Sequence, residues 1–186
     1  MNRSIALAAI LPFAGAAIGL AAVHVPSDRI VTERKVSMKE MAQAAKTISG
    51  MFEGKQSYDA AAFKDAAETI RRNSGDALVA EFPAGSFGGE SDATAEIDRS
   101  RGEFDAFAFH LEEFASALSR TADTVPDGIT DDMRMAHGGL MGGSLLGRRT
   151  DDARQSDPSG IPAEHVFHLM LQDCTGCHAK FREKGR

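Results

Sequence analysis

The two cysteines of this 186-residue chain lie three positions apart near its C-terminus, in the stretch Cys174-Thr175-Gly176-Cys177-His178. A C-x-x-C-H stretch is the attachment signature of a c-type haem, in which both thiols bond to the haem vinyl groups and the imidazole binds iron. A disulfide, a redox dithiol or half of a zinc site is the weaker interpretation, because the chain has no second cysteine pair and a dithiol needs no histidine. The motif therefore predicts one covalently bound haem c, held by Cys174 and Cys177, with His178 as an axial ligand.

The composition favours helices over strands. The chain contains 11 Phe, one Tyr and no Trp, and it has many Ala and Met but few β-branched residues. Its length and its 42% of hydrophobic residues suit one domain with one core. We expect an all-α protein.

Four segments carry apolar residues at alternating steps of three and four, which is typical of helices that pack in a bundle. The expected helices cover residues 31–52, 57–82, 97–118 and 161–181. We expect Gly54 to end the first helix, Ser57 to cap the second and Pro83 to stop it, with Gly75 as a weak point in its middle. Because each apolar stripe must be buried against the others, the pattern predicts an antiparallel four-helix bundle.

Two connections have the composition of loops. Residues 83–92 are rich in turn formers, and either Ser91 or Asp92 is placed to cap the third helix. Residues 123–160 form a longer insertion that contains Met133, Met135, His137 and Met141, with a short helix expected from Thr130. This insertion is either a solvent loop, or a lid or partner-docking surface over the haem, or a source of another ligand.

The N-terminus has the pattern of an export signal. A basic residue at position 3 precedes an apolar run over residues 5–23, and Gly19-Leu20-Ala21 suits a signal peptidase. We expect residues 1–23 to be a signal peptide, or an uncleaved membrane anchor, and residues 24–186 to form a periplasmic haem domain. The two motifs support each other, because bacteria attach haem c outside the cytoplasm.

The net charge of −6 argues against nucleic acid as a partner, since phosphate binding depends on clustered Lys and Arg. An acidic surface instead suits a basic redox partner protein in the periplasm.

The chain resembles the class II cytochromes c, namely cytochrome c′ and its low-spin relatives. The resemblance rests on the C-terminal haem motif followed by Phe181-Arg182, and on Arg34-x-x-x-Met38 in the first expected helix. It covers residues 31–121 and 164–184. The long insertion departs from the family pattern.

This resemblance implies a four-helix bundle with His178 as the proximal ligand and Met38 on the distal side. It also implies that Arg34 lies by a haem propionate, that Lys35 and Ser86 touch the haem edge, and that homodimers form through the first two helices. The residues themselves agree about Arg34, because a guanidinium on an apolar seam needs a carboxylate partner.

Two functions follow from the sixth coordination position of the iron. A thioether ligand from Met38, with Met41 in reserve, would give a low-spin iron suited to electron transfer, whereas an open distal face would bind NO or CO. Met38 suits either role, because methionine also fills apolar gaps. His110 is the one other histidine worth testing as a distal ligand. A peroxidase needs a distal acid–base pair that the first helix does not supply, so we expect a non-enzymatic electron carrier.

Overall fold

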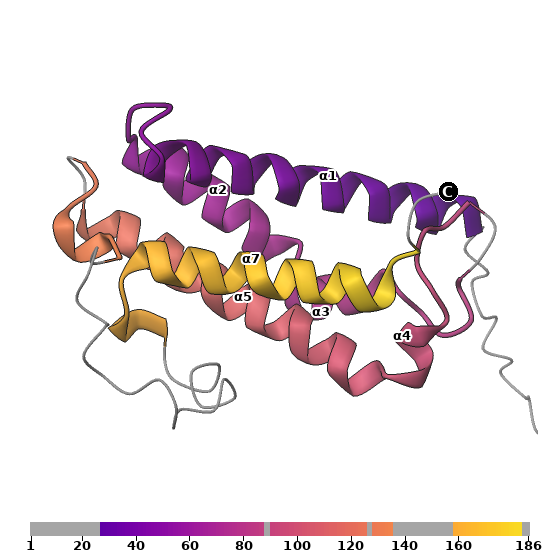
Figure 1. The fold of residues 1–186 in the computed structure, drawn as a ribbon. Coiled ribbons are helices and arrows are strands. Elements are labelled where there is room, and N and C mark those ends of the chain that lie inside the picture. Colours follow the sequence, from indigo (N-terminus) through magenta and orange to yellow (C-terminus); the bar gives the residue numbers. More distant parts are fainter. Residues whose placement is uncertain (1–26, 88–89, 126–127, 136–157, 184–186) are drawn as a thin grey trace, which may run out of the picture.

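Four long helices that successively reverse direction build the molecule (Figure 1). They are α1 (Ser27–Phe52), α2 (Ala60–Arg72), α5 (Arg101–Thr124) and α7 (Ala163–Phe181). The computed structural model describes residues 27–87, 90–125, 128–135 and 158–183, and these contain no β-strand. The prediction of an all-α antiparallel four-helix bundle is confirmed. The predicted signal or anchor at residues 1–23 lies outside the described residues.

Helix α1 buries one stripe with the predicted period but partly different residues. Val31, Met38 and Ala45 fit the apolar period of the sequence but are only partly buried. The buried residues are Arg34, Ser37, Met41, Ala44, Ile48, Met51 and Phe52, most of them at alternating steps of three and four. The helix ends at Phe52, and Gly54 then adopts a φ of +69°, a left-handed conformation that glycine tolerates without strain. The prediction that Gly54 ends the first helix is confirmed, although the helix begins at Ser27, four residues before the predicted start.

The prediction of a continuous second helix over residues 57–82, capped by Ser57, was wrong in two respects. It is broken into α2 and the short α3 (Gly75–Ala80), because Gly75 has a φ of +55° that cannot continue an α-helix. A Cβ on Gly75 would lie 2.1 Å from Oε2 of Glu112 on α5, so the glycine also allows close packing there. The N-cap is Asp59 rather than Ser57, and its carboxylate accepts a hydrogen bond from the Ala62 amide at 2.8 Å.

The third predicted helix is also interrupted. A short α4 (Glu96–Arg99) carries Ile97, and the chain then bends at Ser100 (φ −121°, ψ 39°) before α5 begins. Neither Ser91 nor Asp92 caps a helix. The Ser91 hydroxyl instead accepts a hydrogen bond from the Ala93 amide, and Asp92 pairs with Arg182.

Helix α7 begins directly after Pro162, as predicted, and its far end is tied to the loop before α4. The Thr94 amide donates to the Phe181 carbonyl at 2.9 Å, and the Glu183 amide donates to the Asp92 carbonyl at 2.7 Å. The resulting isolated bridge joins Ala93 and Arg182. This contact holds the C-terminal end of α7 against residues 92–94.

The first part of the insertion packs on the end of the bundle. A 3-10 turn, η1 (Asp131–Met133), stands where a short helix was predicted, and Met133 is only 2% exposed. The Arg134 guanidinium donates to the Phe52 carbonyl at the end of α1, and a Glu164 carboxylate oxygen accepts the Met135 amide. A second 3-10 turn, η2 (Pro158–Gly160), precedes α7. His137 and Met141 lie outside the described residues.

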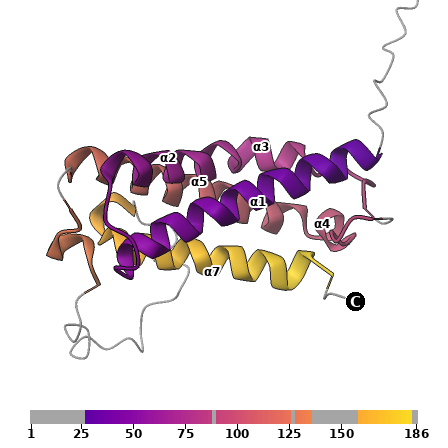
Figure 2. The same cartoon turned by 90° about the horizontal axis from the view of Figure 1, so that it is seen from above.

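Helices α1 and α7 leave a space between them. The extensive helix contacts are α1 with α2, α2 with α5, and α5 with α7, whereas α1 and α7 pack little against each other. Figure 2 shows them diverging towards the C-terminal end of α7. That end carries the cysteine motif, so the opening lies beside it.

None of the helices in the described part of the chain has the length and apolarity needed to cross a membrane.

If the insertion contributes to the fold, removing the Met133 side chain should destabilise the protein. Met133→Ala is expected to lower the free energy of unfolding by about 2–5 kcal/mol, the usual cost of truncating a buried methionine. Urea unfolding of the holoprotein, followed by far-ultraviolet circular dichroism, measures this. The control is Asp132→Ala, an exposed neighbour for which a change within about 0.5 kcal/mol is expected. Equal effects of both substitutions would contradict the packing role.

Candidate functional site

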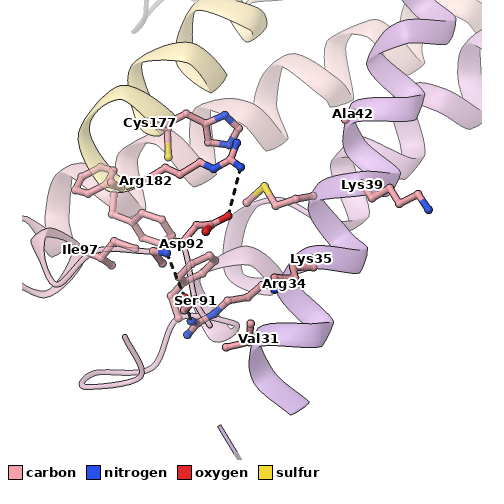
Figure 3. Close-up of a pocket in the computed structure, with 16 residues that line it drawn as sticks. Val31, Arg34, Lys35, Lys39, Ala42, Ser91, Asp92, Ile97, Cys177 and Arg182 are labelled. Carbon is pink, nitrogen blue, oxygen red and sulfur yellow. Dashed lines mark hydrogen bonds and ion pairs between the residues drawn. The ribbon is translucent and has the colours of Figure 1, made fainter. Parts of the chain in front are cut away.

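Both cysteines face the space between α1 and α7. Cys174 and Cys177 are partly buried free thiols one turn apart on α7. Figure 3 shows the Cys177 sulfur directed into the cavity that Val31, Arg34 and Ile97 also line. The three-residue spacing therefore does what the motif requires, since it presents two sulfurs on one face of one helix.

The space consists of two adjoining cavities of about 350 Å³ and 290 Å³. Their walls are mainly apolar, and four residues line both of them: Met38, Ala42, Cys177 and His178. Ligand sites in proteins run to roughly 300–1,000 Å³ and are usually apolar with a few polar groups. The two cavities have the size and character of a site for a large flat hydrophobic group.

The surroundings of the two thiols disfavour the thiolate. Burial raises the pKa of Cys174 to about 11 and that of Cys177 to about 12, and the negative charge of Asp173 adds to both shifts. Reactive cysteines of C-x-x-C oxidoreductases instead have a lowered pKa, which supplies the thiolate. The two cysteines therefore lack the lowered pKa that marks a C-x-x-C oxidoreductase.

His178 lies where both cavities meet. Partial burial lowers the pKa of His178 below the ordinary value, and the positive charge of Arg182 lowers it further. A lowered pKa favours the neutral imidazole, which is the form that binds metals. The donor set of two thiols and one imidazole beside an apolar slot fits a haem c.

Met38 approaches the same place from the opposite helix. It is partly buried on α1 and lines both cavities, as His178 does from α7. Met41 lines only the second cavity, and its sulfur is 4.0 Å from the Ser74 hydroxyl. Of the two methionines predicted as distal residues, Met38 is the one that shares both cavities with His178.

Arg34 is buried, with 4% of its surface exposed, and it is hydrogen-bonded to the loop that follows α3. Its Nε donates to the Glu81 carbonyl at 2.6 Å, its Nη1 donates to the Ser86 carbonyl at 3.0 Å, and its Nη2 donates to the Ser86 hydroxyl. The guanidinium carbon lies 4.2 Å from the Phe82 ring centroid. Arg34 therefore holds the loop that walls the first cavity, a role that the sequence did not indicate.

The remaining predicted site residues fall in different places. Lys35 lines the first cavity, whereas Ser86 lines neither cavity and reaches the site only through Arg34. His110, the predicted alternative distal ligand, also lines neither cavity, and its ring instead faces Asp173 on α7. It is not placed to serve as a distal ligand.

Sequence reasoning missed Asp173. This residue directly precedes Cys174, is 3% exposed and lines the second cavity. The signal available in the sequence was an acidic residue within the apolar stretch of the last helix, four residues after Leu169. An ionised side chain at such a position is rarely buried without a specific partner.

The fold and the site together define a four-helix bundle protein with covalently attached haem. The family model described as Cytochrome C′ matches residues 29–142, and this chain belongs to the cytochrome c′ family. Accordingly, it carries one covalently bound haem c. Members of this family are periplasmic, which agrees with the predicted export.

Solved cytochromes c prime share the fold at low sequence identity. That of Thermochromatium tepidum is 17% identical with a TM-score of 0.61, over 87% of this chain and 100% of that one. Ferric cytochrome c prime from Alcaligenes xylosoxidans is 20% identical with a TM-score of 0.59, over 87% and 98%. The protein from Shewanella frigidimarina is 19% identical with a TM-score of 0.58, over 87% and 99%. No curated protein matches the chain.

If Cys174 and Cys177 hold the haem, their removal should abolish covalent attachment. Wild-type protein made in a host that attaches haem c is expected to gain the mass of one haem and to keep its Soret absorbance after denaturation. The Cys174→Ser, Cys177→Ser double variant should show neither, because no thiol remains to add to a vinyl group. Thr175→Ser, an exposed change between the cysteines, is the control and should behave as wild type. Intact mass spectrometry decides, and haem mass on the double variant would refute the assignment.

Proposed function

We propose that the protein is an exported monohaem cytochrome that carries single electrons between periplasmic partner proteins. Cys174 and Cys177 form the thioethers, His178 is the proximal ligand and Met38 is the distal ligand. The observation that carries the proposal is that Met38 and His178, on helices that pack little against each other, line the same two cavities.

A bound haem supplies a one-electron Fe(II)/Fe(III) couple, and the protein controls that couple through axial ligation, burial and nearby charge. Phe82 and Phe104 wall the first cavity, and Phe107 walls the second. These rings make the cavity walls apolar. A thioether donor raises the reduction potential, so Met38 would favour the ferrous state.

Binding of NO or CO is the second candidate function. Met38 has no hydrogen bond among those of the described residues, so its side chain is held by packing alone. A methionine of this kind can also serve as a movable apolar cover over the distal face. One of the solved structures similar to this chain is a nitric oxide complex of a variant of Alcaligenes xylosoxidans cytochrome c prime.

An enzymatic role has less support. The described residues of α1 contain no histidine, so this helix supplies none of the imidazole that peroxidase acid–base chemistry uses. We therefore propose electron transfer rather than catalysis.

Met38→Ala separates the two functions. In the wild type we expect a near-infrared band from thioether-to-iron charge transfer and slow CO binding by the reduced protein. Met38→Ala should lose the band and bind CO readily, because the sixth position is then open. Met41→Ala is the matched control and should keep the wild-type spectrum, since Met41 lines only the second cavity. A wild-type protein that lacks the band and takes up CO at once would favour gas binding instead.

A redox partner can approach the first cavity where its lining residues are exposed to solvent. Lys35 and Lys39 line the cavity from α1 and both are exposed, and the Lys39 side chain extends away from the other lining residues (Figure 3). Arg182 and Asp92, which also line the cavity and are exposed, pair with each other at 3.3 Å. This edge is therefore more basic than the protein as a whole, whose net charge is −6. We propose that the redox partner is acidic where it docks, which differs from the basic partner that the total charge suggested.

Lys39→Glu tests the basic edge with small oxidants of opposite charge. Oxidation of the ferrous holoprotein by ferricyanide, an anion, should become severalfold slower at low ionic strength, and oxidation by tris(phenanthroline)cobalt(III), a cation, severalfold faster. Added salt should reduce both effects. Lys46→Glu makes the same charge change on α1 outside both cavities, and its rates should stay closer to wild type. Stopped-flow rates measure this, and equal effects of the two variants would mean that electrons do not enter at this edge.

A further inference from the structure

The haem motif contains a glycine that neither its helix nor its chemistry requires. Gly176 lies inside α7, between the two cysteines, at a position where alanine would favour the helix more. Its φ is not among the positive values that call for glycine. The attachment signature leaves the two residues between the cysteines open. The reason for a glycine is therefore to be found in what surrounds it.

Gly176 makes room for an aromatic ring from α5. A Cβ at position 176 would lie 3.3 Å from both Cε1 and Cζ of Phe107, which is tighter than ordinary van der Waals contact. A Cβ on Gly102, an exposed glycine of α5 itself, would meet nothing within 4 Å. The contact between Phe107 and Gly176 therefore limits how closely α5 and α7 approach each other at the haem motif.

The Phe107 ring also reaches the space for the haem. It lines the second cavity, as Cys177 and His178 do. It meets the Phe181 ring edge-on, with the ring centroids 6.3 Å apart and an interplanar angle of 80°. Because Gly176 and Phe181 stand on either side of His178 in the chain, Phe107 packs on α7 both before and after this ligand.

The placement of α7 decides how far the haem stands from Met38. Both cysteines and His178 belong to α7, whereas Met38 belongs to α1. Helices α1 and α7 pack little against each other, and the extensive contacts that connect them run through α2 and α5. The contact of α5 with the haem motif is therefore one link that sets the gap across which Met38 must reach the iron.

We propose that Phe107, packed on Gly176, is a positioning residue that sets the distance between the haem iron and the Met38 sulfur. The inference rests on the proposed ligation by Met38 and deepens it by naming a residue on which that ligation depends. Metal–ligand distances in working sites hold within about 0.2 Å. A Cβ at position 176 requires its neighbour to give by a few tenths of an ångström, which is enough to weaken such a bond. Close-packed side chains transmit this kind of displacement because they leave few voids to absorb it.

A cycle of single and double variants of the holoprotein tests the proposal. The readouts are the near-infrared charge-transfer band of the ferric protein and the rate of CO binding by the ferrous protein. Gly176→Ala should weaken the band and raise the CO rate severalfold, because the added methyl group displaces the ring or the helix. Phe107→Leu lacks Cε1 and Cζ, so adding Gly176→Ala to it should change both readouts severalfold less.

Gly102→Ala is the matched control, since it adds the same methyl group to α5 in open space, and it should follow the wild type. Intact mass and circular dichroism confirm that each variant is haem-loaded and folded. A contact that only stabilised the bundle would change the midpoint of unfolding and leave the band as it is.

The outcomes separate this inference from the function on which it rests. A wild type with the band and a Gly176→Ala variant with unchanged readouts overturn the inference alone. Equal effects of Gly176→Ala with and without Phe107→Leu also overturn it, because the substitution then acts without the ring. A wild type without the band overturns the proposed ligation and this inference together. A severalfold smaller effect in the Phe107→Leu background, or a band already lost in folded, haem-loaded Phe107→Leu, supports it.

Discussion

The structure depends on one stripe of α7 meeting different neighbours along its length. Near the start of the helix the stripe carries Val166, Phe167 and Met170 into the shared core, and one turn further on it presents Cys174 and Cys177 to the gap beside α1. Because α1 packs mainly on α2, it can diverge from α7 without losing its own buried stripe. A bundle with α1 and α7 in full contact would have no room beside the cysteines. The divergence of these two helices is what makes a cofactor site possible.

A single buried arginine links the first helix to the wall of that site. Arg34 donates to the Glu81 and Ser86 carbonyls, so α1 helps to position the loop after α3. The other end of this loop region is held by the bridge between Ala93 and Arg182. The loop wall of the first cavity is thus held by the hydrogen bonds of Arg34 and by the backbone bridge to Arg182.

Much of the fold could be predicted from local pattern, and the errors have physical causes. The periodicity of α1 and the start of α7 were readable because a helix that buries one face repeats every three to four residues. The same periodicity continued across Gly75 and Ser100, so it hid two breaks that depend on backbone conformation. The packing of Met133 on the bundle end has no local signature, since it depends on which segments meet in space.

The sequence by itself determined that two thiols and an imidazole share one helix and that the chain forms a helical bundle. These follow from spacing, which is a property of a single segment. That Met38 is the methionine to consider first was implied by the resemblance to the class II cytochromes c. Only the tertiary structure decided that Met38 shares both cavities with His178, that Arg34 binds a loop, and that His110 meets Asp173. Those facts depend on the relative placement of helices far apart in the chain, and that placement is set by how their buried faces fit together.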